Sequence, residues 1–202
     1  RSPSRGLGDV YKRQIEDEYF ILFGSGLMQE AHRRWFENKL PEKGVTYLNR
    51  SDDYHGVAIS GPKSRKLLNQ ITRDDVSQES FKFRDIRMTY IGDVPAIIIR
   101  MSFSGELGYE IYCKPHFLVK LAESIEKAGE GLGFCWYGSR ALLSMRLEKQ
   151  WGVWTLDFRP DFTAAESGLD AFISWGKDFI GKEAAEKEKR EGTKQKLSLI
   201  HI

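Results

Sequence analysis

Hydrophobic and polar positions alternate in short stretches along much of the chain, separated by turns rich in glycine, proline and acidic residues. Period-two alternation and an abundance of β-branched and aromatic residues predict half-buried strands. We expect strands over Tyr19–Phe23, Val45–Leu48, Gly56–Ile59, Ile86–Ile91, Pro95–Met101 and Tyr109–Tyr112. The Gly92-Asp93 pair is a short-turn signal, so the two strands that flank it are expected to form a hairpin.

Other stretches repeat their apolar residues every three or four positions, which is typical of amphipathic helices. Helices are expected over Leu27–Leu40, Lys63–Ile71, Pro115–Lys127, Tyr137–Lys149 and Gly181–Glu191, with loops and a short strand over residues 150–180. The charged run 182–196 reads as a solvated helix face. Strands in hairpins separated by helices indicate the α+β class, an antiparallel sheet with packed helices.

Composition narrows the function classes. The chain has 202 residues, 30% of them charged, and a net charge of +2, which argues against a dedicated nucleic-acid binder. Its apolar runs fall short of the ~20 residues that a membrane-spanning helix needs, so no membrane partner is expected. Cys113 and Cys135 lack metal-ligand spacing and are expected to be buried free thiols. The histidines have no acidic or cysteine neighbours at ligand spacing, so we assign no metal.

The two ends differ from the rest of the chain. Residues 1–14 have no hydrophobic period and resemble translated adapter sequence, so we interpret them as a non-native segment. Residues 191–202 are interpreted as a linker and a non-native tail. Between them, residues 15–190 are expected to form one domain. The chain does not begin with Met, and we interpret it as a fragment of a longer protein.

The most informative segment is Phe103–Tyr112, F-S-G-E-L-G-Y-E-I-Y. In a strand, residues two apart point the same way, so Glu110 and Tyr112 share a face, with Gly108 offering close approach beside them. A carboxylate next to aromatic rings suits a flat, nitrogen-rich heterocycle, because the acid accepts hydrogen bonds from ring N–H groups while the rings stack. The same letters also suit an ordinary glycine-rich hairpin with a surface carboxylate and a core tyrosine.

Three further motifs follow in order: W-Y-G-S-R-A-L-L-S-M-R-L-E-K-Q, D-F-R-P-D-F-T-A-A-E-S-G-L-D-A-F-I and K-D-F-I-G-K-E-A. From about residue 16 to about residue 185, the series resembles the folate-binding domain of the T-protein (aminomethyltransferase) family. The resemblance is to the form found in the C-terminal part of dimethylglycine and sarcosine dehydrogenase-like flavoenzymes. It implies tetrahydrofolate as the cofactor, one-carbon transfer as the activity, and FAD only on a missing N-terminal domain.

The resemblance also implies a set of cofactor-binding residues. Glu110 would hold the pterin ring through its N–H groups, and Tyr112 would form a wall of the same pocket. Phe103 stands where the related dehydrogenases usually have tyrosine, so any hydrogen bond from that hydroxyl is absent or replaced. That loss would be worth about 1 kcal/mol.

Two more residues belong to the implied set. Arg140, at the start of a predicted helix, would hold the glutamyl-tail carboxylates or a carboxylate partner; a surface arginine is the alternative. Trp154 lies among the aromatic residues Trp151, Phe158 and Phe162, which would wall the ligand cleft, close a hydrophobic lid or pack in a core. The catalytic residue stays unknown, because the family's aspartate is expected upstream of this fragment.

Three functions remain open. The first is the folate domain of a dimethylglycine or sarcosine dehydrogenase-like flavoenzyme, whose partner would be the flavin domain of the same chain. The second is a stand-alone glycine-cleavage T-protein, whose partner would be a lipoyl carrier protein. The third is a non-catalytic folate-binding relative of the iron–sulfur assembly type, whose K-G-C-Y-x-G-Q-E-type segment is not found here. The expected location is the bacterial cytoplasm or the mitochondrial matrix.

Overall fold

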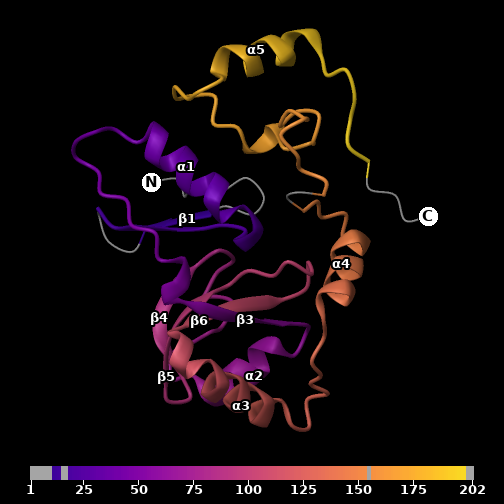
Figure 1. The fold of residues 1–202 in the computed structure, drawn as a ribbon. Coiled ribbons are helices and arrows are strands. Elements are labelled where there is room, and N and C mark those ends of the chain that lie inside the picture. The colour runs from indigo at the N-terminus through magenta and orange to yellow at the C-terminus, as the bar shows by residue number, and fades with distance from the viewer. Residues whose placement is uncertain (1–10, 15–17, 154–155, 199–202) are drawn as a thin grey trace. The chain divides into compact units, whose positions relative to one another are not determined.

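The computed structural model describes residues 11–14, 18–153 and 156–198. The chain divides into two compact units, which we describe separately: residues 33–149, and residues 1–32 together with 150–202. Figure 1 shows the helices and strands of both.

The unit of residues 33–149 is built on a four-stranded antiparallel sheet in the order β3-β6-β5-β4. Its strands are β3 (His55–Ser60), β4 (Ile86–Ile91), β5 (Val94–Ile99) and β6 (Gly108–Cys113). As predicted, β4 and β5 form a hairpin across Gly92-Asp93, and Pro95 lies near the start of its strand.

Two helices, α2 (Ser64–Ile71) and α3 (Leu118–Gly129), cover one face of this sheet (Figure 1). The hydrophobic core forms between them and the strands, because every second strand residue points toward the helices. On β6 the core residues are Tyr109, Ile111 and Cys113, all at most 1% exposed. The alternate β6 residues, Glu110 and Tyr112, therefore belong to the opposite face.

The remaining helices of the chain carry little core. They are α1 (Gln29–Lys39), α4 (Ser139–Glu148) and α5 (Lys182–Glu191). α5 has no buried residue, in agreement with the predicted solvated helix, and it has Glu183 in its first turn and Lys189 and Arg190 in its last. Short 3-10 turns complete the elements: η1 (Gly26–Met28), η2 (Ser51–Asp53), η3 (Pro115–Phe117) and η4 (Asp170–Phe172).

The second unit contains a two-stranded antiparallel sheet of β1 (Tyr11–Gln14) and β2 (Phe20–Phe23). β2 matches the strand predicted at Tyr19–Phe23, whereas β1 lies within residues 1–14, which the sequence predicted to be a non-native segment. Two reciprocal hydrogen bonds stabilise the helical turn at Thr163–Glu166. The Glu166 N–H donates to Thr163 Oγ1 and the Thr163 N–H donates to Glu166 Oε2, each at 3.1 Å. This reciprocal pair is a capping box.

Two secondary-structure predictions are wrong. Residues 45–48 form no strand: Tyr47 instead packs its ring 5.7 Å from that of Phe36 on α1, and Val45 and Leu48 are exposed. The outer edge of β3 is not paired with residues 45–48, so the alternation there reflects packing such as the Tyr47–Phe36 contact and not sheet pairing. The described part of residues 150–180 likewise holds turns and η4 but no strand.

The two cysteines also differ from each other. Cys113 is buried in the core, and this burial raises the pKa of its thiol. Cys135 is exposed, contrary to our expectation. It lies in the irregular segment between α3 and α4, where the backbone belongs to no sheet or helix that could cover it.

Three arginines, Arg65, Arg87 and Arg100, hold the loop between α2 and β4 through its backbone carbonyls. Arg87 donates to the carbonyl oxygens of Asp75, at 2.8 Å, and Ser80, at 2.6 Å. A guanidinium is suited to this role because its planar fork presents several N–H groups at once. The loop has no regular structure of its own, so these bonds define its conformation.

Candidate functional site

The second face of the four-stranded sheet carries the candidate site. Register places Ile97 opposite Tyr112 and Ile99 opposite Glu110, so both isoleucines share the face of the Glu110 carboxylate. Ile99 is 0% exposed and Ile97 4%. The carboxylate therefore lies beside dry, apolar neighbours on the β5 side.

On the other side, β3 presents small residues to the same two positions. Gly56 is opposite Tyr112, and Ala58 is opposite Glu110. Both are exposed. On the far edge of this face β4 presents two exposed apolar side chains, Met88 and Tyr90. The result is an apolar sheet face with one acidic group near its middle.

The structure brings two of the predicted site residues together. The Tyr112 hydroxyl donates a hydrogen bond to Glu110 Oε2 at 2.8 Å, and both side chains are half-buried. An O–H donor to a carboxylate is charge-assisted and roughly twice as strong as a neutral pair. The sequence indicated the shared face but not this bond, which depends on how the tyrosine ring lies along the strand.

Gly108 has a different role from the one predicted. A Cβ at this position would lie 2.5 Å from Ser102 Cβ and 2.8 Å from the Ile59 carbonyl oxygen. The space beside Gly108 is therefore filled by the protein itself, not left open for a ligand. Its glycine is required because the 100–107 loop folds back onto the start of β6.

The loop before β6 is held by further polar contacts. Ser102 and Ser104 share a hydrogen bond of 2.8 Å between their hydroxyls, and Gly105 has φ +76°, a left-handed conformation that favours glycine. Glu106 forms an ion pair with Lys149 at 2.8 Å. The hydrogen bond to Glu106 raises the pKa of the Lys149 ammonium. The first acid of the G-E-L-G-Y-E motif is thus engaged in a structural ion pair.

Sequence reasoning missed a polar contact on the Glu110 face. The Tyr137 hydroxyl lies 2.9 Å from Ser60 Oγ, which connects the segment before α4 to the end of β3. Ser60 is opposite Gly108 in the sheet register and so shares the face of Glu110. The contact spans 77 positions of sequence, and no local motif indicates it.

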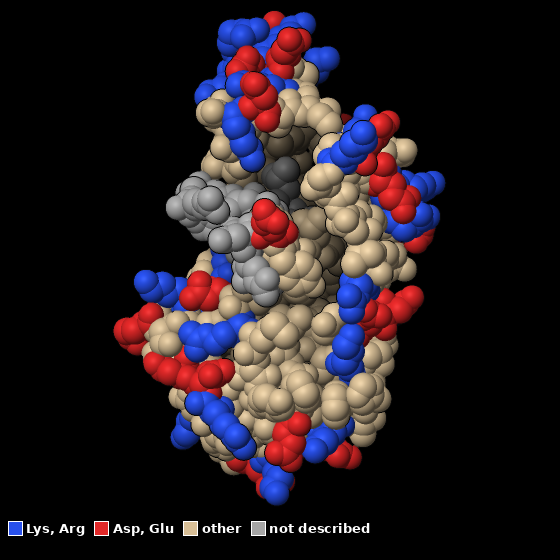
Figure 2. Space-filling model, turned by 90° about the vertical axis from the view of Figure 1, so that its left-hand side faces the viewer, with Lys and Arg blue, Asp and Glu red and all other residues tan. Residues whose placement is uncertain are grey.

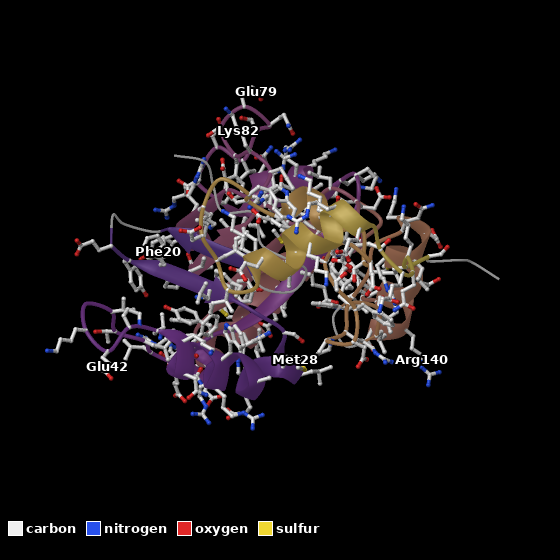
Figure 3. The ribbon with its side chains drawn as sticks, turned by 90° about the horizontal axis from the view of Figure 1, so that it is seen from above. Phe20, Met28, Glu42, Glu79, Lys82 and Arg140 are labelled. Carbon is white, nitrogen blue, oxygen red and sulfur yellow. The ribbon has the colours of Figure 1, made fainter. Side chains whose placement is uncertain are left out.

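The other predicted site residues stay predictions. Phe103 lies half-buried in the loop before β6. Arg140 is exposed on the first turn of α4, and Figure 3 shows its side chain extending away from the ribbon. Trp154 lies outside the described residues.

The aromatic residues that neighbour Trp154 in the sequence take part in core packing and in lining a cavity. Phe158 is 7% exposed and packs on Gly152, where a Cβ would lie 2.3 Å from its ring. Together with Trp151, Leu169 and Phe172, Phe158 lines a cavity of about 360 Å³ in the unit that contains residues 150–198. Phe158 therefore packs in a core and also lines a cavity, while the ligand-cleft and lid roles of these aromatic residues stay predictions.

Charge gives no sign of a nucleic-acid surface on the visible side of the molecule. Figure 2 shows lysine and arginine interspersed with aspartate and glutamate, with no continuous field of one sign. Within the described residues, no group of three or more His, Cys, Asp or Glu side chains has the arrangement of a metal site. None of the described helices is long and apolar enough to cross a membrane.

The structure thus shows an α+β fold whose four-stranded sheet has a mostly apolar second face, with the Glu110 carboxylate near its middle. The sequence profile of the GCVT N-terminal domain matches residues 5–177. The chain therefore belongs to the glycine-cleavage T-protein (aminomethyltransferase) family, and the resemblance found in the sequence motifs is confirmed.

Individual relatives fall into two groups. Mitochondrial dimethylglycine dehydrogenase from Homo sapiens is 34% identical over 94% of this chain, and the aminomethyltransferase of Caldanaerobacter subterraneus subsp. tengcongensis is 32% identical over 95%. The chain spans 22% of the length of the first and 51% of the second.

A solved structure of similar fold is heterotetrameric sarcosine oxidase from Corynebacterium sp. U-96, in complex with pyrrole 2-carboxylate. The TM-score is 0.52 at 14% identity, over 67% of this chain and 70% of that one. At this identity the likeness concerns the fold alone, and it confirms the predicted α+β class.

Proposed function

We propose that this chain is the tetrahydrofolate-binding, one-carbon-transfer region of an N-methyl amine dehydrogenase-like flavoenzyme. The observation that supports the proposal most directly is the Glu110–Tyr112 pair on an apolar sheet face. The similarity to dimethylglycine dehydrogenase over nearly the whole chain supports the same class of protein.

The chemistry of this face fits a reduced pteridine. Its pyrimidine half is flat, largely apolar in its faces, and carries adjacent N–H donors on one edge. A carboxylate accepts two N–H bonds in one plane, and these are charge-assisted. Because each carboxylate oxygen has two lone pairs, the bond from Tyr112 leaves Glu110 able to accept from a ligand as well.

In this function the chain contributes binding and orientation. Glu110 would fix the edge of the ring, and the apolar surface of β5 would exclude water from it. Tetrahydrofolate, when bound, supplies the amine nitrogens that accept the one-carbon unit. The amine would be oxidised at FAD on a flavin domain of the same polypeptide, in the bacterial cytoplasm or the mitochondrial matrix.

The experiment that tests the proposal is an anaerobic calorimetric titration of the 202-residue chain with tetrahydrofolate. Glu110→Gln should weaken binding by about 1–3 kcal/mol, because a charge-assisted pair becomes a neutral one. Glu106→Gln is the matched control, since it changes the other acid of the same motif, which pairs with Lys149. Equal affinity of the wild type and Glu110→Gln would remove Glu110 from the site, and a wild type that does not bind would refute the function.

A stand-alone aminomethyltransferase is the second candidate, supported by relatives of that name at 30–32% identity. Its carbon donor would be an aminomethyl group on a lipoyl carrier protein. Sequencing the source DNA upstream of Ile15 separates the two candidates. An open frame of several hundred codons with a flavin-binding G-x-G-x-x-G motif would establish the dehydrogenase, and a start codon about a hundred residues upstream would establish the transferase.

A further inference from the structure

Gly56 has no conformational reason to be glycine. It lies in the middle of β3, and its φ is not among the positive values that favour glycine. A glycine inside a strand costs roughly 0.5–1 kcal/mol relative to alanine. Such a position often marks the close approach of another group.

The group that approaches is the ring of Tyr112. A Cβ on Gly56 would lie 2.8 Å from Tyr112 Cδ1 and 2.9 Å from Cε1. The two residues are direct partners in the β3–β6 register. The ring therefore lies over the backbone of Gly56, in space that any other side chain would occupy.

The ring position fixes the hydroxyl. With the ring over Gly56, the Tyr112 hydroxyl lies 2.8 Å from Glu110 Oε2, one step of the same strand face away. Ala58, the register partner of Glu110, is also small. On β3, two small residues, Gly56 and Ala58, thus leave space for the side chains of Tyr112 and Glu110.

We propose that Gly56 and Tyr112 are positioning residues for Glu110. Gly56 seats the Tyr112 ring, and the Tyr112 hydroxyl holds the carboxylate in one orientation. The inference rests on the proposed function, in which Glu110 receives the adjacent N–H donors of a planar heterocycle. A glutamate has three rotatable bonds, and ordering it before the ligand arrives lowers the entropy cost of binding.

The binding test uses Gly56→Ala, Tyr112→Phe and the double variant, titrated with tetrahydrofolate. Each single change should weaken binding about five- to tenfold, the factor that corresponds to one lost hydrogen bond. The double variant should bind no more weakly than the weaker single variant, because both changes break the same bond. Effects that multiply, or a Tyr112→Phe variant that binds as the wild type does, would overturn the proposal.

Two matched controls separate positioning from general damage. Gly176→Ala adds a Cβ where no atom lies within 4 Å, and Tyr109→Phe removes a tyrosine hydroxyl on the opposite, core face of the sheet while keeping the ring that stacks on Phe81. Both should bind tetrahydrofolate as the wild type does. Weakened binding in either control would show that the assay responds to any glycine or tyrosine change.

A ligand-free measurement decides the inference even if the proposed function fails. In protein with ¹³C-labelled tyrosine rings, the Tyr112 Cζ signal, assigned through Tyr112→Phe, reports the hydrogen bond of its hydroxyl. Gly56→Ala and Glu110→Gln should move this signal in the same direction, and Gly176→Ala should leave it in place. A Cζ signal that Gly56→Ala leaves unmoved, in a protein whose other signals show it is folded, would overturn the proposal.

Discussion

Tyr109→Phe should stabilise the chain without changing its ligand binding. Tyr109 is 0% exposed, and none of the described residues offers its hydroxyl a hydrogen-bond partner. Its ring stacks on Phe81 with a centroid separation of 6.1 Å and an interplanar angle of 7°. Phenylalanine keeps this contact and removes only the polar atom.

The magnitude follows from two opposed terms. Burying an unpaired hydroxyl costs about 1–3 kcal/mol by protein mutational data. The void left by one oxygen atom, on the order of 10 Å³, costs about 0.2 kcal/mol at ~24 cal/mol per Å³. Tyr109→Phe should therefore raise the free energy of unfolding by about 1–3 kcal/mol.

Urea denaturation followed by circular dichroism measures this change. With an m value on the order of 2 kcal/mol per M, the midpoint should rise by about 0.5–1.5 M at unchanged slope. Tyr112→Phe is the comparison, because its ring lies on the other sheet face and its hydroxyl is bonded. A midpoint for Tyr109→Phe below that of the wild type would show that the hydroxyl has a partner and that the reasoning is wrong.

Three further changes test the loops that adjoin the sheet, the one before β6 and the one between α2 and β4. Gly108→Ala should destabilise the chain by about 1–3 kcal/mol in the same urea assay, because its Cβ would lie 2.5 Å from Ser102 Cβ; a neutral result would mean that the loop moves freely. Arg87→Ala should cost about 2 kcal/mol and speed proteolysis of the loop before β4, with Arg87→Lys only partly restoring it. Hydrogen bonds from the Ser77 backbone and hydroxyl lower the pKa of the Asp75 carboxyl in the folded chain. The stability that this carboxylate contributes is therefore fully present above its unfolded-state pKa of about 3.9, and it is lost as the pH falls through the lower pKa of the folded state. The stability difference between wild type and Asp75→Asn should therefore be visible at pH 7 and vanish in strong acid, and a difference that grows on acidification would contradict this.

Periodicity predicted the elements that bury a continuous face. Strands β3 to β6 and helices α2 and α3 were found because alternation and helical spacing directly record which side meets the core. The strand expected at residues 45–48 failed because alternation indicates that a segment is half-buried but does not specify what covers its buried side. There, Tyr47 is packed on Phe36 instead.

The site was predictable only as far as strand geometry reaches. Alternation placed Glu110 and Tyr112 on one face, but the bond between them depends on a ring lying over Gly56, a residue 56 positions earlier in the chain. The Ser60–Tyr137 contact is likewise set by the tertiary fold. Such long-range neighbours leave no local pattern, so a single sequence cannot reveal them.

The motif G-E-L-G-Y-E-I-Y therefore combines two kinds of constraint. The glycines serve a loop that folds back on β6, the first glutamate is paired with Lys149, and Tyr109 and Ile111 fill the core. Only Glu110 and Tyr112 point to the candidate ligand face. Because residues of the two kinds alternate along one strand, a shift of β6 by one residue would turn the carboxylate into the core and Tyr109 out of it. The fully buried Tyr109 and Ile111 thus hold the register on which the position of Glu110 depends, so packing on one sheet face sets the chemistry of the other.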